Sequence, residues 1–343
     1  MILVTGGAGY IGSHTAKALA RAGYHAVVYD NLSRGHHWAV RWGPLEQGDL
    51  LDRERLEKVL REHRIEAVLH FAALAYVGES MQAPELYFRN NVGGSLSLLD
   101  AMRAAGVRRL VFSSTCAVYG VPDVVPISED HPKAPANPYG ESKLMTEKLL
   151  LWEGVCHGLQ WVALRYFNAA GCDAEGEIGE VHSPESHLIP SLLEAAMGLR
   201  GACPIFGSDY PTPDGTCIRD YVHVTDLAGA HVRALQYLEQ GGGNIAVNLG
   251  TGDGYSVKQI LAAAEAATGR TIPVDRQPRR PGDPPRLVAA ATRASELLGW
   301  KPQHSAIDHI LATAWAWQQK AAGVAAASGI SSGREAPAAR KPE

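Results

Sequence analysis

The first third of the chain alternates short apolar runs with longer stretches of helical periodicity. The apolar runs have the length and composition of buried strands and cover residues 2–5, 25–30, 67–71 and 109–113. The stretches 14–22 and 86–105 repeat apolar positions at helical spacing. Strands that alternate with helices in this way are joined by right-handed crossovers and form a parallel sheet. The pattern therefore predicts an α/β protein with a Rossmann-like, doubly wound parallel sheet.

The second half of the chain is less regular. A helix is expected over residues 139–151, with Asn137 as its cap and Pro138 at its first position, and a strand follows at 161–167. From about Gly171 onward, segments rich in Pro, Gly and His alternate with expected helices at 187–197 and 225–238 and an expected strand at 245–249. We expect residues 1–170 to form the sheet domain, with a return near 225–250. Residues 171–320 would mainly form a smaller C-terminal α/β lobe for the substrate, and 321–343 a disordered tail.

Composition narrows the classes of partner. The 343 residues are 46% hydrophobic and 20% charged, which suffices for a large core, and 32 basic against 36 acidic residues give a net charge of −4. The charge balance argues against nucleic acid as a partner. The sequence contains no apolar run of about 18 residues, so no membrane span is predicted. The N-terminus does not resemble a secretory signal, so we expect a cytoplasmic protein. The five cysteines are scattered, and no His/Cys/Asp cluster predicts a metal.

A glycine-rich turn joins the first expected strand to the first expected helix. Gly6, Gly9 and Gly12 follow the spacing Gly-x-x-Gly-x-x-Gly, and Tyr10 and Ile11 lie within it. An ordinary glycine turn would explain such a motif alone. Between a strand and a helix, however, small residues let a dinucleotide pyrophosphate approach the backbone N–H groups of the helix N-terminus. The context therefore predicts a dinucleotide-binding loop.

An acidic residue at the end of the second strand indicates which dinucleotide binds. Asp30 follows Gly12 by 18 residues, where a carboxylate accepts hydrogen bonds from the adenosine ribose hydroxyls. A carboxylate at this position disfavours a 2′-phosphate, so NAD is preferred over NADP. Asp49 and Leu50 could meet the adenine, and Phe71, Ala72 and Ala73 lie at the end of the expected strand 67–71, where small residues allow close approach. The other cofactor contacts expected from position are Asn31, Asn90, Ser113 and Phe167.

Tyr139 and Lys143 lie four residues apart on one expected helix and so share a face. A phenol is a poor base at neutral pH, but a neighbouring ammonium and a positively charged nicotinamide favour the phenolate. Lys143 can also hold the nicotinamide ribose. Thr115 ends the run Ser113-Ser114-Thr115 after the preceding strand, at the sheet edge where α/β proteins place ligands. We therefore expect Tyr139, Lys143 and Thr115 to be catalytic.

These motifs together resemble the extended short-chain dehydrogenase/reductase family. The resemblance is carried by Gly-Gly-Ala-Gly-Tyr-Ile-Gly-Ser-His at 6–14, Ser-Ser-Thr at 113–115 and Tyr-Gly-Glu-Ser-Lys at 139–143. Three further motifs resemble its nucleotide-sugar epimerase branch: Arg-Tyr-Phe-Asn-Ala-Ala-Gly at 165–171, Asp-Gly-Thr-Cys-Ile-Arg-Asp-Tyr-Val-His-Val at 214–224 and Arg-Arg-Pro-Gly-Asp at 279–283. The resemblance covers roughly residues 1–318.

The resemblance implies an isomerase that interconverts UDP-galactose and UDP-glucose through a 4-keto sugar, with tightly bound NAD and in a homodimer. Tyr139 would exchange the proton of the sugar 4-hydroxyl, and Thr115 would be the catalytic hydroxyl. Asn168 would bind the sugar diphosphate, Arg219 and Arg280 would hold the phosphates, and Asp283 would accept from the uridine ribose. The expected substrate contacts are Thr115, Tyr139, Asn168, His187, Leu188, Arg219, Arg280 and Asp283.

Some positions depart from the best-known members of the family. Ala75 stands where they have a Lys near the cofactor, His187 where some have Asn, and Leu287 near the residue that gates N-acetyl sugars. A 4-epimerase of UDP-N-acetylglucosamine, UDP-xylose or UDP-glucuronate is therefore an alternative, as is a net oxidoreductase. A dehydratase would need an Asp-Glu pair where Cys116 and Ala117 follow the catalytic Thr. A non-enzymatic NAD-binding module would not need the Tyr, Lys and Thr together.

Overall fold

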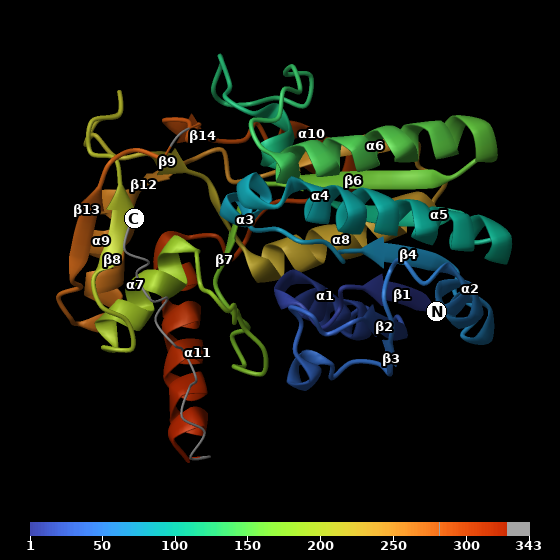
Figure 1. The fold of residues 1–343 in the computed structure, drawn as a ribbon, viewed down its shortest axis with the longest axis horizontal. Helices are drawn as coiled ribbons and strands as arrows, with labels where there is room; N and C mark the ends of the chain where they lie inside the picture. Colours follow the sequence, from blue (N-terminus) through green and yellow to red (C-terminus); the bar gives the residue numbers. More distant parts are fainter. Residues whose placement is uncertain (281, 328–343) are drawn as a thin grey trace, which may run out of the picture.

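A seven-stranded sheet forms the centre of the protein in the computed structural model, which describes residues 1–280 and 282–327 (Figure 1). All neighbouring strands of this sheet are parallel. Their order is β11 (Ile245–Leu249), β6 (Gln160–Tyr166), β5 (Arg109–Thr115), β4 (Ala67–His70), β1 (Ile2–Thr5), β2 (Ala26–Asp30) and β3 (Leu45–Gln47). The α/β prediction and the return of the chain to the sheet through β11 are confirmed.

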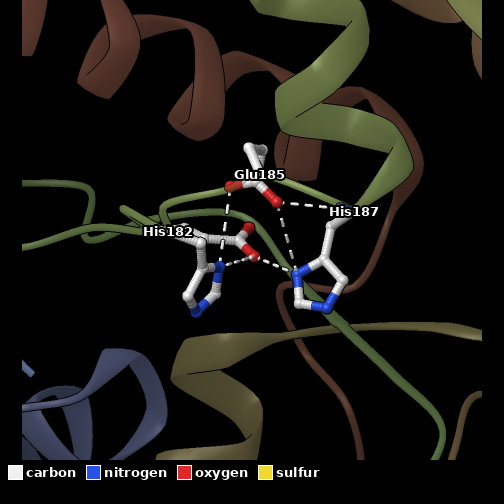
Figure 2. A group of neighbouring side chains, drawn as sticks. His182, Glu185 and His187 are labelled. Atoms are coloured by element: carbon white, nitrogen blue, oxygen red, sulfur yellow. Dashed lines mark hydrogen bonds and ion pairs between the residues drawn. The ribbon is translucent and has the colours of Figure 1, made fainter. Parts of the chain in front are cut away.

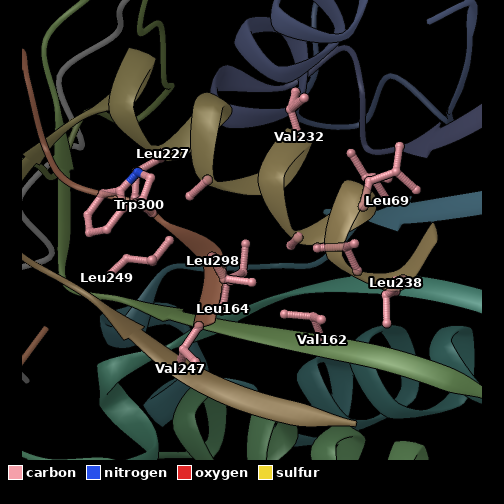
Figure 3. Packing of buried hydrophobic residues seen from close by; sticks show 14 of the residues in the cluster. Leu69, Val162, Leu164, Leu227, Val232, Leu238, Val247, Leu249, Leu298 and Trp300 are labelled. Carbon is pink, nitrogen blue, oxygen red and sulfur yellow. The ribbon is translucent and has the colours of Figure 1, made fainter. Parts of the chain in front are cut away.

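Helices cover both faces of the sheet, which explains why its strands are apolar along their whole length. One face packs against α1 (Tyr10–Arg21), α8 (Val224–Glu239) and α10 (Thr292–Leu298), and the other against α2 (Arg53–Glu62), α5 (Gly94–Ala105) and α6 (Pro138–His157). Val4 belongs to the first layer and its neighbour Leu3 to the second, as the pleat of a strand requires. Figure 3 shows the first layer, where Val162 and Leu164 of β6 lie beneath Leu227 and Leu238 of α8.

The helix that carries the Tyr-x-x-x-Lys pair begins as predicted. Asn137 accepts a hydrogen bond from the Gly140 N–H at 2.9 Å, and Pro138 is the first residue of α6. The stretch 86–105, in contrast, is not one regular helix. It divides into α4 (Pro84–Tyr87), a π-helical turn (Phe88–Gly93) and α5. Such π turns are frequent at functional sites, and Asn90 on this one faces the cleft described below.

The C-terminal part forms a smaller α/β lobe beside the sheet domain (Figure 1). Its core joins α7 (Leu188–Ala196), α9 (Val257–Thr268) and α11 (Ile307–Ala327) to the parallel pair β8 (Cys203–Phe206) and β13 (Val274–Gln277). Short strands connect the lobe to the sheet domain: β7 (Asn168–Ala170) with β10 (Tyr221–His223), and β9 (Ile218–Arg219) between β12 (Tyr255–Ser256) and β14 (Arg286–Leu287). The remaining elements are α3 (Val77–Gln82) and the 3₁₀ turns His37–Ala39 and Cys116–Tyr119.

The last helix is longer than the sequence pattern suggests. The expectation of a disordered tail from residue 321 is wrong for residues 321–327, which continue α11; residues 328–343 lie outside the described residues. Alanines at this end of the helix favour its extension, because Ala has the highest helix propensity. Among the described helices, none combines the length and apolarity that a membrane crossing requires.

Candidate active site

The glycine turn between β1 and α1 lies against the end of β4. Gly6 has φ +71°, and a Cβ there would lie 2.5 Å from the backbone nitrogen of Ala72. A Cβ on Gly12 would lie 2.3 Å from the carbonyl oxygen of Gly6. Both glycines are therefore needed for the close approach of backbone to backbone, and the turn leaves the first N–H groups of α1 facing a cleft.

This cleft brings together most of the residues expected to hold the cofactor. The predicted residues that line it are Gly6, Gly9, Tyr10, Ile11, Gly12, Asp30, Asn31, Leu50, Phe71, Ala72, Ala73, Asn90, Ser113, Tyr139 and Lys143. Asp49 and Phe167 are not among the lining residues. The carboxylate of Asp49 accepts a hydrogen bond from Asn31 at 2.8 Å, and Phe167 is buried in an apolar cluster with Leu144.

Asp30 ends β2 at the edge of the cleft, where a ribose acceptor was expected. Its two carboxylate oxygens accept hydrogen bonds from the backbone of Ala8 at 3.0 Å and Leu32 at 2.8 Å. The nearby guanidinium of Arg34 is held by Glu79 at 2.6 Å and lies over the ring of Tyr76. Because Arg34 is already paired, it is not available to a 2′-phosphate in this arrangement. The glycine turn and Asp30 therefore fit NAD better than a dinucleotide with a 2′-phosphate.

Thr115, Tyr139 and Lys143 converge at the carboxyl end of β5. The ammonium of Lys143 donates to the carbonyl of Ser113 at 2.9 Å, and the Thr115 side chain is close enough to the Tyr139 phenol to lower its pKa. All three residues are buried or nearly so. The strand end places one hydroxyl beside the phenol, and one helical turn places the ammonium on the same side. The arrangement can move a proton between a bound hydroxyl and the phenol.

Burial dominates the protonation of these groups in the protein alone. It raises the pKa of the Tyr139 phenol to about 12, and the nearby Thr115 side chain offsets this only in part. Burial also lowers the pKa of the Lys143 ammonium to about 7. The phenolate expected from the Tyr-x-x-x-Lys pair is therefore disfavoured by the chain itself. A positively charged group in the cleft, such as an oxidised nicotinamide, would act in the opposite direction.

Two tyrosines take part in the site: Tyr166, which the sequence pattern did not single out, and Tyr10 of the glycine turn, which was expected at the cofactor but makes a further contact. Tyr166, at the end of β6, hydrogen-bonds Ser113 and lines the cleft. Tyr166 lies on an apolar strand, so the sequence pattern alone predicts a core residue at this position. Tyr10 donates its hydroxyl proton to the carbonyl of Gly171 at 2.5 Å, which connects the glycine turn to the segment entering the smaller lobe. Only the motif around residues 165–171 could have pointed to this contact.

A second group of predicted residues lies on β9 and the segments beside it. The guanidinium of Arg219 is hydrogen-bonded to the carboxylate of Asp283, and that of Arg280 lies 3.8 Å from the centre of the Phe206 ring. Asn168 starts β7, and its N–H donates to Asp220 at 2.9 Å. The thiol of Cys116 is close enough to Arg219 and Tyr139 to be coupled electrostatically to both. Asn168, Arg219, Arg280 and Asp283 are not among the described residues that line the cleft at the glycine turn.

His187 and Leu188 begin α7, and His187 reaches the wall of the cleft. His187 is part of a cluster with Glu180, His182 and Glu185, all within one short segment. Burial alone would lower the pKa of His182, but its contacts with the two glutamates raise it to about 10. No His/Cys/Asp cluster in the sequence predicted a metal, whereas the structure brings these two histidines and two glutamates together. The alternation Glu-x-His-x-x-Glu-x-His at 180–187 is the signal that could have found this group.

Comparisons with known proteins agree with this geometry. A model of the NAD dependent epimerase/dehydratase family matches residues 2–250. A relative from Rhizobium leguminosarum bv. trifolii, named UDP-glucose 4-epimerase, is 53% identical over 93% of this chain and 97% of its own length.

Two solved structures show the same architecture over nearly the whole chain. The crystal structure of UDP-glucose 4-epimerase from Brucella ovis in complex with NAD has a TM-score of 0.90 and 54% identity, covering 92% of this chain and 97% of the other. The enzyme from Bifidobacterium longum, in complex with NAD⁺ and UDP, has a TM-score of 0.89 and 39% identity, covering 93% and 98%.

Proposed function

We propose that this chain, which belongs to the NAD dependent epimerase/dehydratase family, interconverts UDP-galactose and UDP-glucose with tightly bound NAD. Relatives of that name share about half of its residues over nearly its full length. The structural observation that carries the proposal is that Tyr139 and Lys143, the latter anchored to Ser113, line the same cleft as the glycine turn. That arrangement combines proton transfer with a dinucleotide site.

The residues around Tyr139 would handle the proton of the reaction. NAD, when bound, supplies the acceptor and donor of the hydride that leaves and returns to C4, so the reaction has no net oxidation. Tyr139 takes the proton of the sugar 4-hydroxyl as the 4-keto sugar forms and returns it at the end. Thr115 holds that hydroxyl beside the phenol. Lys143, anchored to the Ser113 carbonyl, places its amino group near the developing phenolate, which its protonated form would stabilise although burial lowers its pKa to about 7.

The group around β9 would hold the nucleotide part of the substrate. Arg219 and Arg280 offer guanidinium groups to the diphosphate, and Asp283 offers a carboxylate to the ribose. Arg219 is preset by its contact with Asp283 and is buried, which supports a binding rather than a surface role. Asn168, His187 and Leu188 complete the proposed substrate contacts.

A direct conversion assay tests the proposal. Purified protein is incubated with UDP-galactose and no added cofactor, and the products are followed by NMR. We expect UDP-glucose to appear, and its absence would refute both the reaction and the tight retention of NAD. Parallel incubations with UDP-N-acetylglucosamine, UDP-xylose and UDP-glucuronate define the sugar range, because Leu287 lies in register with Arg219 and is of intermediate size for a gate.

We also propose that the protein acts as a cytoplasmic homodimer. Met145, Trp152 and Val155 lie at helical spacing on α6 and are 38%, 63% and 69% exposed. A row of large apolar side chains at this spacing is typical of a helix that packs against a partner. Light scattering of the wild type and of Trp152→Glu tests this point; a wild type with the mass of a single chain would refute it.

A further inference from the structure

Two histidines and two glutamates converge on one point beside the cleft, in the segment that precedes α7 (Figure 2). We propose that Glu180, His182, Glu185 and His187 form a binding site for one divalent metal ion of the Zn²⁺ type. Two imidazole nitrogens and two carboxylates are a ligand set that suits Zn²⁺. The proposal adds a metal to the protein without changing the reaction proposed above.

The distances between the ligand atoms are those of a small coordination sphere. In a tetrahedral site with metal–ligand distances of about 2.0–2.1 Å, neighbouring ligand atoms are about 3.3 Å apart. His182 Nδ1 lies 3.3 Å from a Glu180 oxygen and 3.5 Å from a Glu185 oxygen. His187 Nδ1 lies 3.9 Å from the other oxygen of Glu185. Only the contact between His187 Nδ1 and Glu180 is shorter, and these two atoms would have to move slightly apart to admit the ion.

His182 supplies an independent indication that a partner is missing. Its Nδ1 atom is buried, and within the described residues it makes no contact with proper hydrogen-bond geometry, although carboxylates lie 3.3 and 3.5 Å away. A buried polar atom normally has a partner along its lone pair or its N–H bond. Figure 2 shows the ring directing this nitrogen toward the carboxylates, at the position where a metal would sit.

The charge of the cluster is compatible with a divalent cation in place of the two imidazole protons. The side chains of Glu180 and Glu185 are only 4% and 3% exposed, and the two histidines are their only cationic partners among the described residues. A divalent ion with two neutral imidazoles would neutralise both carboxylates. The other acidic cluster of the structure differs, because Lys17 Nζ already contacts Asp173, Glu175 and Glu177 at 2.8 Å each.

Backbone contacts hold the two glutamates in place. The carbonyl of Glu180 accepts a hydrogen bond from the indole of Trp317 at 3.2 Å, and the carbonyl of Glu185 accepts one from Arg200 at 2.8 Å. A Cβ on Gly179 would lie 2.4 Å from the ring of Trp317, so the segment packs closely on α11. Ligands held by such outer contacts are preorganised for a metal.

The proposed ion would have a structural role next to the substrate. Four protein ligands leave no open position, which is typical of structural rather than catalytic zinc. The ion would fix the conformation of the segment 180–187, which contributes His182 and His187 to the lining of the cleft. Coordination through Nδ1 fixes the proton of His187 on Nε2, which Figure 2 shows pointing away from the carboxylates. That N–H remains available to an anionic substrate.

Zinc binding by the whole protein, carrying no polyhistidine tag, tests the proposal. The protein is freed of metal with a chelator and titrated with ZnCl₂ by equilibrium dialysis, alongside His182→Gln and Glu180→Gln. His63→Gln is the matched control, because His63 contacts a single glutamate, Glu46, at 2.8 Å. We expect about one tightly bound Zn²⁺ in the wild type and the control, and binding at least ~10-fold weaker in the two ligand variants. Equal binding by wild type and His182→Gln, or no binding by the wild type, overturns the proposal.

A second measurement uses only the wild type and is independent of how well the variants fold. CoCl₂ replaces zinc, and the visible spectrum reports the number of ligands. A four-coordinate N₂O₂ site gives intense absorption bands in the visible range, and these should disappear when one equivalent of ZnCl₂ is added. The weak spectrum of six-coordinate cobalt, or no spectral change, contradicts the proposed ligand set.

Discussion

The two ends of the proposed active site are built in different ways. At the cofactor end, Gly6, Thr115 and Tyr139 lie at or next to the ends of regular elements of the central sheet domain. At the nucleotide end, Arg219 and Asp283 lie on a two-residue strand and a loop, and a direct ion pair connects them across 64 residues of sequence. The cofactor end is therefore positioned by backbone architecture, and the nucleotide end by contacts between side chains.

This difference has a functional meaning. Backbone architecture positions atoms rigidly, as proton transfer and close cofactor approach require. Ion pairs on loops can rearrange, which suits a site that must admit and release a charged substrate. Substitutions at the cofactor end should therefore change kcat or retention of NAD, whereas those at the nucleotide end should change KM.

The largest effect is expected for Tyr139→Phe. Removing the hydroxyl deletes the proposed proton acceptor, and such losses cost about 10²–10⁴-fold in rate. NAD should stay bound, because the glycine turn and Asp30 are unaffected. We would measure kcat and KM for UDP-galactose, together with the NAD released on denaturation. Tyr119→Phe serves as a control for loss of a buried phenol, since Tyr119 bonds Asn248 at 2.7 Å and does not line the cleft. A normal kcat in Tyr139→Phe would show that Tyr139 is not the proton acceptor and that the cofactor end does not carry out the proton transfer.

Gly12→Ala should disturb the same end through the backbone. The added methyl group would lie 2.3 Å from the Gly6 carbonyl oxygen, so the turn must move at a cost of about 1–3 kcal/mol. We expect a lower melting temperature and purification with less bound NAD. Gly78→Ala is the matched control, because a Cβ at Gly78 meets nothing within 4 Å. Equal NAD content and stability in both variants would show that the turn is not rigidly set.

The same contrast explains how much could be predicted from sequence. Strand and helix periodicity predicted a parallel, doubly wound sheet, and the glycine turn, Asp30 and Tyr139 lie in one cleft because they are at the ends of its regular elements. The placement of Arg219 beside Asp283 could not be derived from periodicity, since it depends on packing between loops distant in sequence. It was expected only through the family resemblance. The split of stretch 86–105 by a π turn also gave no periodic signal.

At the nucleotide end, Arg219→Lys should act on binding. Lysine keeps the charge but loses the planar fork that can contact Asp283 and a phosphate together. A charged hydrogen bond contributes about 1.5–3 kcal/mol, so we expect kcat/KM to fall about 10–100-fold, mainly through KM. Arg286→Lys on the neighbouring strand is the control, because that side chain is exposed. A fall in kcat at unchanged KM would mean that this end, too, is coupled to the chemical step.

The smallest effect concerns the rigidity of the cofactor end at acid pH. His70 ends β4 and is buried between Thr5 at 2.7 Å and Ser95 at 3.0 Å, and burial lowers its pKa to about 3. The unfolded chain, with its ordinary histidine pKa near 6.5, therefore binds more protons between these values. Stability should fall as the pH drops below about 6.5, by up to about 1.4 kcal/mol per pH unit from this residue.

Urea unfolding of the wild type and of His70→Gln between about pH 4.5 and 7 measures this contribution. The variant cannot take up the proton, so its free energy of unfolding should depend less steeply on pH, while other buried histidines such as His231, whose pKa burial lowers to about 4, keep part of the slope. His25→Gln, at an exposed position, should retain the wild-type slope. If His70→Gln retains that slope as well, His70 is protonated without cost, and the cofactor end is less rigid than its backbone architecture indicates.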